Sequence, residues 1–197
     1  MQIAILGPLE VRDDDGRLIP VVGVRLRGLL TRLALDAGAD VPAAELIDAV
    51  WADEVPGNAG NALQSLVSRL RRALGDPTLI QQARLGYRLA ITPDDVDVEH
   101  FAVTVADGRQ ALQARDFHRA ATLLATAEQL WRGEPLADAD DALYASGPRA
   151  RWEELRLGAT ADRLAAELEL GRAAGVIAPL EQLVAEYPLR ERFVGQL

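Results

Sequence analysis

The sequence contains no cysteine and no lysine, and the first absence narrows what chemistry the chain can perform. Without cysteine there is no disulfide framework, no thiolate nucleophile and no thiolate metal site. Only two histidines are present, His100 and His118, and no glycine-rich phosphate loop or metal-spaced cluster accompanies them. No apolar run is long enough to cross a membrane. We therefore expect a cytoplasmic protein that is not an enzyme, needs no cofactor or metal and has no membrane partner.

The charge balance is unfavourable for a nucleic-acid partner when the chain is taken as a whole. All 21 basic residues are arginines, against 30 acidic residues, and the net charge is −9. DNA-binding proteins usually carry a basic surface. The two halves differ, however: residues 1–95 hold 10 arginines and 13 acids (net −3), and residues 96–197 hold 11 arginines and 17 acids (net −6). Because the local field matters more than net charge at a DNA surface, a DNA-binding first half stays open.

The first half follows the order sheet, three helices, hairpin. Alternating β-prone residues and turn residues predict the strands, and apolar residues three and four positions apart predict the helices. The predicted strands cover residues 2–12, 18–24, 78–81 and 87–91, and the predicted helices cover 26–37, 42–51 and 58–74.

The helix predicted over residues 58–74 carries the clearest functional pattern. Its apolar residues share one face, and no acidic residue lies between Asn58 and Gly75. Asparagine and glutamine can pair with adenine, arginine with guanine or phosphate, and serine with either. A DNA-reading helix is therefore predicted, with the solvated face of an ordinary amphipathic helix as the alternative. The candidate contacts on or near the polar face are Asn61, Gln64, Ser65, Ser68, Arg69, Arg71 and Arg72.

Basic residues outside this helix extend the candidate DNA surface. Arg84 and Arg88 lie on the predicted hairpin, and a wing beside a recognition helix typically lays arginine along the minor groove or the backbone. Tyr87 is expected to pack under the hairpin, where its hydroxyl group could still reach a phosphate. Arg25 and Arg27 begin the first helix and could hold a phosphate at its N-terminus, or form surface salt bridges instead.

The second half is predicted to be all-helical. Residues 92–98 are polar and turn-prone, and they mark the boundary between a domain of residues 1–95 and a domain of residues 96–197. Short connections between helices of about 15 residues favour stacked helical hairpins. The expected helices cover residues 99–114, 117–131, 148–171 and 174–186.

The residues of both halves resemble one bacterial family. The first half resembles the OmpR/PhoB-like winged helix in the form used by SARP-type activators of secondary metabolism, and the second resembles the bacterial transcriptional activation domain. The matching stretches are Leu6–Val11, Ala44–Trp51, Asn61–Gly75, Gly86–Leu89, Leu130–Gly133, Glu153–Leu157 and Pro188–Arg192.

The resemblance implies a fold, a function and partners. The fold is an α+β winged helix followed by an all-α, tetratricopeptide-like domain, which we expect to be incomplete at its C-terminus. The implied function is transcription activation, with the third helix in the major groove of double-stranded DNA carrying direct repeats at a promoter. The loop of residues 52–57 would face RNA polymerase through Asp53 and Glu54, for which helix capping or simple solvation is the alternative.

Two questions stay open in the sequence. The acidic net charge favours an alternative in which the winged helix and the helical stack bind only protein partners. Homodimer formation through the helical domain also remains open. The polar and basic face of residues 61–72 disfavours the purely protein-binding alternative.

Overall fold

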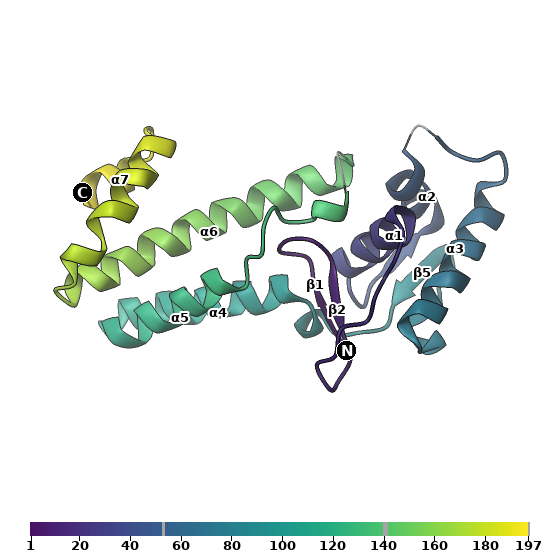
Figure 1. Cartoon of the computed structure of the whole chain (residues 1–197), viewed down its shortest axis with the longest axis horizontal. Helices are drawn as coiled ribbons and strands as arrows, with labels where there is room; N and C mark the ends of the chain where they lie inside the picture. Colours follow the sequence, from purple (N-terminus) through teal and green to yellow (C-terminus); the bar gives the residue numbers. More distant parts are fainter. Residues whose placement is uncertain (53, 140–141, 197) are drawn as a thin grey trace. The chain divides into compact units, whose positions relative to one another are not determined.

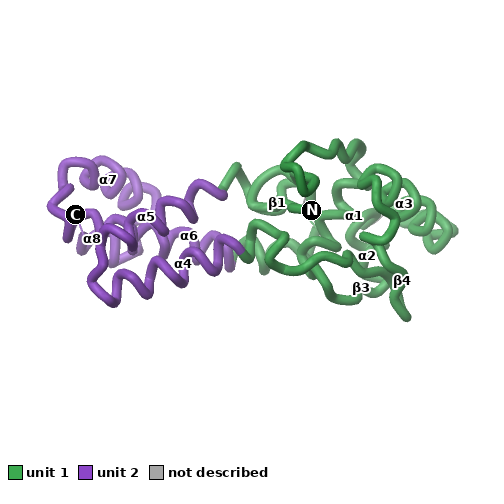
Figure 2. Tube along the Cα trace, turned by 90° about the horizontal axis from the view of Figure 1, so that it is seen from below, with its two compact units in different colours: residues 1–99, 131–150 green, residues 100–130, 151–197 purple. Residues whose placement is uncertain are grey.

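The computed structural model describes residues 1–52, 54–139 and 142–196, whose helices and strands are drawn in Figure 1. Its contacts divide the chain into two compact units, coloured separately in Figure 2. Unit 1 comprises Met1–Glu99 and Trp131–Ala150, and unit 2 comprises His100–Leu130 and Arg151–Leu197.

In the described part of residues 1–96, three α-helices combine with two small antiparallel sheets. One sheet has two strands, β1 and β2, and the other has the order β3-β5-β4. The predicted order of sheet, three helices and hairpin is confirmed. The elements are β1 (Gln2–Ala4), β2 (Glu10–Arg12), α1 (Val24–Leu35), β3 (Asp40–Pro42), α2 (Ala43–Trp51), α3 (Ala59–Leu74), β4 (Ile80–Gln82) and β5 (Gly86–Leu89).

Apolar residues at helical spacing build the core of unit 1. Leu29, Leu30 and Leu33 of α1 are fully buried, as are Leu46 of α2 and Leu70 of α3. Burial of a leucine side chain contributes about 1.5 to 3 kcal/mol to the stability of the fold. Each helix therefore turns its leucine face towards the core.

The strand predicted over residues 18–24 is wrong. Leu18 forms only an isolated bridge to Arg12, and α1 already begins at Val24. The partner of β1 is β2, because Gly7, with φ +148°, and the following proline reverse the chain within the predicted strand of residues 2–12. A side chain at Gly7 would also meet the Arg132 Cβ atom at 2.9 Å.

The short strand β3 was missed in the sequence, where Val41 and Pro42 were expected to open the second helix. β3 pairs with β5, and Val41 lies opposite Tyr87. Three residues carry too little local pattern to predict a strand whose partner lies more than 40 positions away.

Unit 2 is helical, as predicted. A side chain at Gly108 of α4 would meet Leu124 of α5 at 2.7 Å, so glycine lets these helices approach closely. The buried Asp162 of α6 receives Arg109 from α4, with Nε 2.8 Å from Oδ2, and Arg192 from α8. The helices of the second half are α4 (Asp97–Gln113), α5 (Phe117–Gln129), α6 (Leu143–Glu169), α7 (Ile177–Glu186) and α8 (Glu191–Gln196), of which α4 and α6 begin within unit 1.

The segment Trp131–Ala150 packs within unit 1 although the sequence groups it with the second half. The amides of Arg132 and Leu136 each donate to a carbonyl of the N-terminal segment, Leu6 O and Ile5 O, over 2.8 Å. The domain division at residue 95 stays a prediction. These hydrogen bonds show that residues 131–150 pack against the N-terminal segment of unit 1.

Candidate nucleic-acid interface

Helix α3 has a clearly defined start and end. The Asn58 side chain accepts a hydrogen bond from the Asn61 amide at 3.3 Å, which caps the first turn. Gly75 ends the helix in the left-handed conformation, with φ +76°. Between these ends the structure buries the predicted apolar face: Leu63, Leu66, Val67, Leu70 and Leu74.

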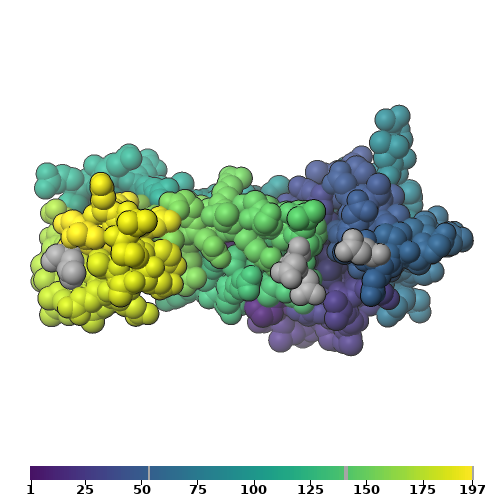
Figure 3. All heavy atoms as spheres, turned by 90° about the horizontal axis from the view of Figure 1, so that it is seen from above, coloured from purple at the N-terminus to yellow at the C-terminus, as the bar shows by residue number. Residues whose placement is uncertain are grey.

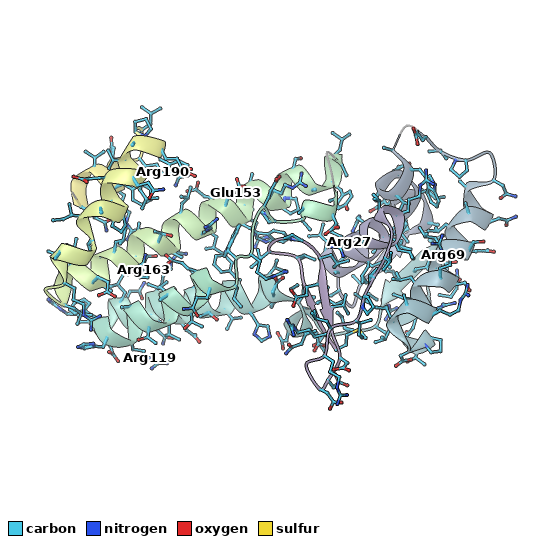
Figure 4. The ribbon with its side chains drawn as sticks, in the orientation of Figure 1. Arg27, Arg69, Arg119, Glu153, Arg163 and Arg190 are labelled. Carbon is cyan, nitrogen blue, oxygen red and sulfur yellow. The ribbon has the colours of Figure 1, made fainter. Side chains whose placement is uncertain are left out.

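The opposite face of α3 is a polar and basic surface. Its side chains are exposed, and Figure 4 labels Arg69 among them. Within the described part of the chain, no hydrogen bond or ion pair engages the guanidinium groups of Arg69 and Arg72. They are therefore available to an external anion. The exposed residues of this face, which we call the α3 face, are Asn61, Gln64, Ser65, Ser68, Arg69 and Arg72.

Arg71 differs from its two arginine neighbours because its side chain is used inside the protein. Its Nε and Nη2 atoms donate to the carbonyl of Ile80 at 2.9 and 2.5 Å. Ile80 begins β4, so Arg71 connects the last turns of α3 to the hairpin. The Arg71 guanidinium group therefore supports the hairpin from inside the protein. A direct DNA contact would need a guanidinium group without such a partner.

The β4–β5 hairpin packs closely against β3 and is joined to α3 through Arg71. A side chain at Gly86 would lie 2.0 Å from Val41 O and 2.6 Å from the Ala43 amide nitrogen, so only glycine allows β5 to approach β3 this closely. The Ala43 amide also donates to Leu85 O at 2.9 Å. The end of the hairpin projects from unit 1 beside β4, and its atoms stand out from the surface in Figure 3.

The candidate residues on the hairpin have three different environments. Arg84 is exposed and has no hydrogen-bond or ion-pair partner among the described residues. Arg88 is half-buried, and its Nε atom donates to Asp40 Oδ1 at 2.7 Å. Tyr87 is only 5% exposed, as its expected packing under the hairpin requires.

The two arginines at the start of α1 also differ in their partners. Arg25 is exposed, and its guanidinium group lies 3.8 Å from the Glu54 carboxylate, a loose pair that an anion could replace. Arg27, labelled in Figure 4, donates from Nε and Nη2 to Asp138 and from Nη2 to Leu9 O. Arg27 therefore takes the salt-bridge alternative, although its partner comes from a segment far along the sequence.

Two carboxylates for which the sequence predicts no role, Asp97 and Asp138, hold segments of unit 1 together. Asp97 Oδ1 and Oδ2 accept the amides of Ile5 and Leu6 at 2.7 and 3.0 Å. Burial raises the pKa of Asp97 above its ordinary value, and the two amides and Arg132 oppose the shift. An aspartate in a polar boundary segment gives no sequence signal for this role, because its partners are backbone amides about 90 residues away.

Asp138 shows the opposite balance. Its Oδ2 atom accepts the Leu9 amide at 2.5 Å, and both carboxylate oxygens pair with Arg27. Burial alone would raise the pKa of Asp138, but the hydrogen bonds from Arg27 and Leu9 outweigh it and hold the pKa below its ordinary value. The same contact raises the pKa of Arg27.

The loop between α2 and α3 is described only in part. Glu54 is exposed, and Asp53, the other acid predicted to contact RNA polymerase, lies outside the described residues. Among the residues that the structure describes, no helix is long and apolar enough to cross a membrane. None of the His, Asp and Glu side chains described is grouped in a way that could hold a metal ion.

Comparison with known proteins assigns the family. The family model described as Bacterial transcriptional activator domain matches residues 96–197, and the model described as Transcriptional regulatory protein, C terminal, matches residues 23–89. The regulatory protein DnrI of Streptomyces peucetius is 32% identical over all of this chain and 75% of its own length. The chain belongs to the SARP-type transcriptional activators. The predicted family resemblance is thereby confirmed.

Other family members extend beyond the matched region. The transcriptional regulator RedD of Streptomyces coelicolor is 38% identical over 98% of this chain, which covers 57% of RedD. The structure of Mycobacterium tuberculosis EmbR in complex with a low-affinity phosphopeptide aligns with a TM-score of 0.91 at 33% identity, over 100% of this chain and 53% of EmbR. The chain thus spans only slightly more than half of these two regulators.

Proposed function

We infer that this chain is a sequence-specific DNA-binding transcription regulator, an activator that binds direct repeats at promoters. The α3 face carries this inference. It presents six exposed polar or basic side chains with no acidic residue between Asn58 and Gly75, on a helix whose other face is buried. A helix of this kind fits the major groove, where amide and guanidinium groups distinguish base pairs. Family membership supports the inference, and a DNA-binding regulator would act in the bacterial cytoplasm.

The structure changes which arginines the proposal uses. Arg69, Arg72 and Arg84 have no internal ion pair or hydrogen bond among the described residues, and Arg25 has only a loose pair. Arg27, Arg71 and Arg88 are held by internal partners. We therefore assign DNA contact to the first group and a supporting role to the second.

RNA polymerase is proposed as the protein partner, through the loop that contains Glu54. The exposed Glu54 side chain lies in the loop that leads into the proposed DNA-reading helix. It could pair with a basic surface of a polymerase bound at the same promoter. Homodimer formation is proposed as a separate possibility for the helical domain. The net charge of −9 favours the competing function, a module that binds only proteins, and the first experiment separates the two.

The deciding experiment measures DNA binding by fluorescence anisotropy at two salt concentrations, with duplexes that carry promoter-like direct repeats. Arg69→Ala/Arg72→Ala should reduce affinity by at least about tenfold, since a base contact contributes about 1 to 3 kcal/mol. If both arginines touch phosphates, the slope of log K against log salt becomes shallower by about 2.

A matched control removes the same charge from elsewhere. Arg119 and Arg151 are exposed and lie on α5 and α6, so Arg119→Ala/Arg151→Ala should leave DNA affinity within about twofold of the parent. Equal losses in both double variants would indicate non-specific charge. A folded protein that binds no duplex at low salt would contradict the proposal and favour the protein-binding module.

A further inference from the structure

An exposed leucine occupies the end of the hairpin that the proposed function places on DNA. Leu85 is 66% exposed and follows the exposed Arg84. No acidic residue occurs between Asp76 and Asp94, so the whole hairpin is neutral or basic. Single exposed leucines are common on protein surfaces, so this one carries weight only through its surroundings.

The backbone at Leu85 and its neighbours is held by hydrogen bonds and close packing. Its carbonyl accepts the Ala43 amide at 2.9 Å, and the Ala83 amide donates to Gly86 O at 2.9 Å. Gly86, the next residue, is packed against β3 without room for a side chain. Through Arg71 and Ile80 O the hairpin is also joined to α3. The backbone that carries the Leu85 side chain therefore has a defined place next to α3.

The chemistry of the exposed Arg84 and Leu85 side chains suits a DNA groove better than the sugar-phosphate backbone. Arginine is attracted to the narrow, strongly negative minor groove of A·T-rich DNA. Leucine has no hydrogen-bonding group, so it cannot hold a phosphate, but apolar side chains do pack on sugars and base edges in the minor groove. There the 2-amino group of guanine is the one feature that separates G·C from A·T. An apolar side chain would leave that amino group without a partner.

We propose that Leu85 is a specificity-determining residue, which packs in the minor groove beside the site read by α3 and disfavours G·C pairs there. The proposal rests on the DNA-binding function above. It adds an apolar reader to a surface whose other proposed contacts are polar or charged.

The test uses base pairs that differ in one groove only. A duplex is first obtained by in vitro selection from a randomised library with the parent chain. Each base pair of the site and its flanks is then replaced in turn by A·T, G·C or inosine·C, and affinity is measured by anisotropy. Inosine·C matches G·C in the major groove but lacks the 2-amino group in the minor groove. At the position covered by Leu85, A·T and inosine·C should bind equally well and about tenfold more tightly than G·C.

The variants Leu85→Ala and Leu18→Ala complete the experiment. Leu85→Ala should lower the tenfold preference to less than about twofold, with an unchanged melting temperature because the side chain is exposed. Leu18 is 61% exposed and lies outside the hairpin, so Leu18→Ala should keep the preference. An unchanged preference in Leu85→Ala, or inosine·C binding like G·C at every position, would overturn the proposal while DNA binding itself stands. If selection yields no duplex, the proposed function fails as well.

Discussion

The ion pair between Arg27 and Asp138 should make a measurable contribution to the stability of unit 1. Arg27 Nη2 lies 2.8 Å from Asp138 Oδ2, and Nε contacts the other oxygen, so the pair is bidentate. The side chains are 27% and 17% exposed. The relevant perturbations are Arg27→Ala, Asp138→Ala and the double variant, which together form a double-mutant cycle.

The expected magnitude lies between those of surface and buried pairs. Exposed pairs couple by about 0.2 to 1 kcal/mol, whereas breaking a buried pair costs about 3 to 5 kcal/mol. For this half-buried pair we expect a coupling free energy of about 2 kcal/mol. Asp138→Ala should cost more than Arg27→Ala, about 3 against about 2.5 kcal/mol, because the nearly buried Leu9 amide also loses its acceptor. The double variant should then cost about 3.5 kcal/mol.

Urea unfolding followed by tryptophan fluorescence measures these free energies, since Trp51 and Trp131 both lie in unit 1. Arg17 and Asp15 provide a matched control: their charged groups are 2.5 Å apart, but their side chains are 75% and 68% exposed. The same cycle on this control should give less than about 0.5 kcal/mol. A coupling this small for Arg27 and Asp138 would refute the reasoning that burial and bidentate geometry make the pair stabilising.

Two further predictions concern the hairpin and the buried carboxylates. Gly86→Ala should lower the free energy of unfolding by about 3 kcal/mol and weaken DNA binding, because the new Cβ atom overlaps backbone atoms of β3 and α2; equal melting temperatures would contradict this. Asp138 has a lowered pKa, so its stabilisation is present above its ordinary pKa and is lost as the pH falls through the folded value. Asp97 has a raised pKa and contributes with the opposite sign, losing stability as the pH rises through the folded value. Unfolding between about pH 5 and pH 3 should therefore show a smaller acid-induced loss in Asp138→Asn and a larger one in Asp97→Asn than in the parent.

Local patterns accounted for much of what was predicted correctly. The spacing of Leu63, Leu66 and Leu70 determines which face of α3 is buried, because a helix removes a single apolar face from water by packing that face against its own domain. The helices themselves follow from the same periodicity. Two strand predictions failed. β3 was missed because it has only three residues and pairs with the distant β5. The strand predicted at the described residues 18–24 is absent because a turn at Gly7 lets β1 pair with β2 instead.

The sequence by itself determined the α3 face and the family, since both depend on residue types at fixed spacing along one segment. Only the tertiary structure decided which arginines are free. Arg69 and Arg71 look alike in the sequence, but Arg71 reaches the carbonyl of Ile80, and Arg27 finds Asp138 at a separation of 111 residues. A guanidinium group is available to DNA only where the fold has placed no internal acceptor next to it. Because such acceptors can come from distant segments, only the tertiary structure shows whether one is present.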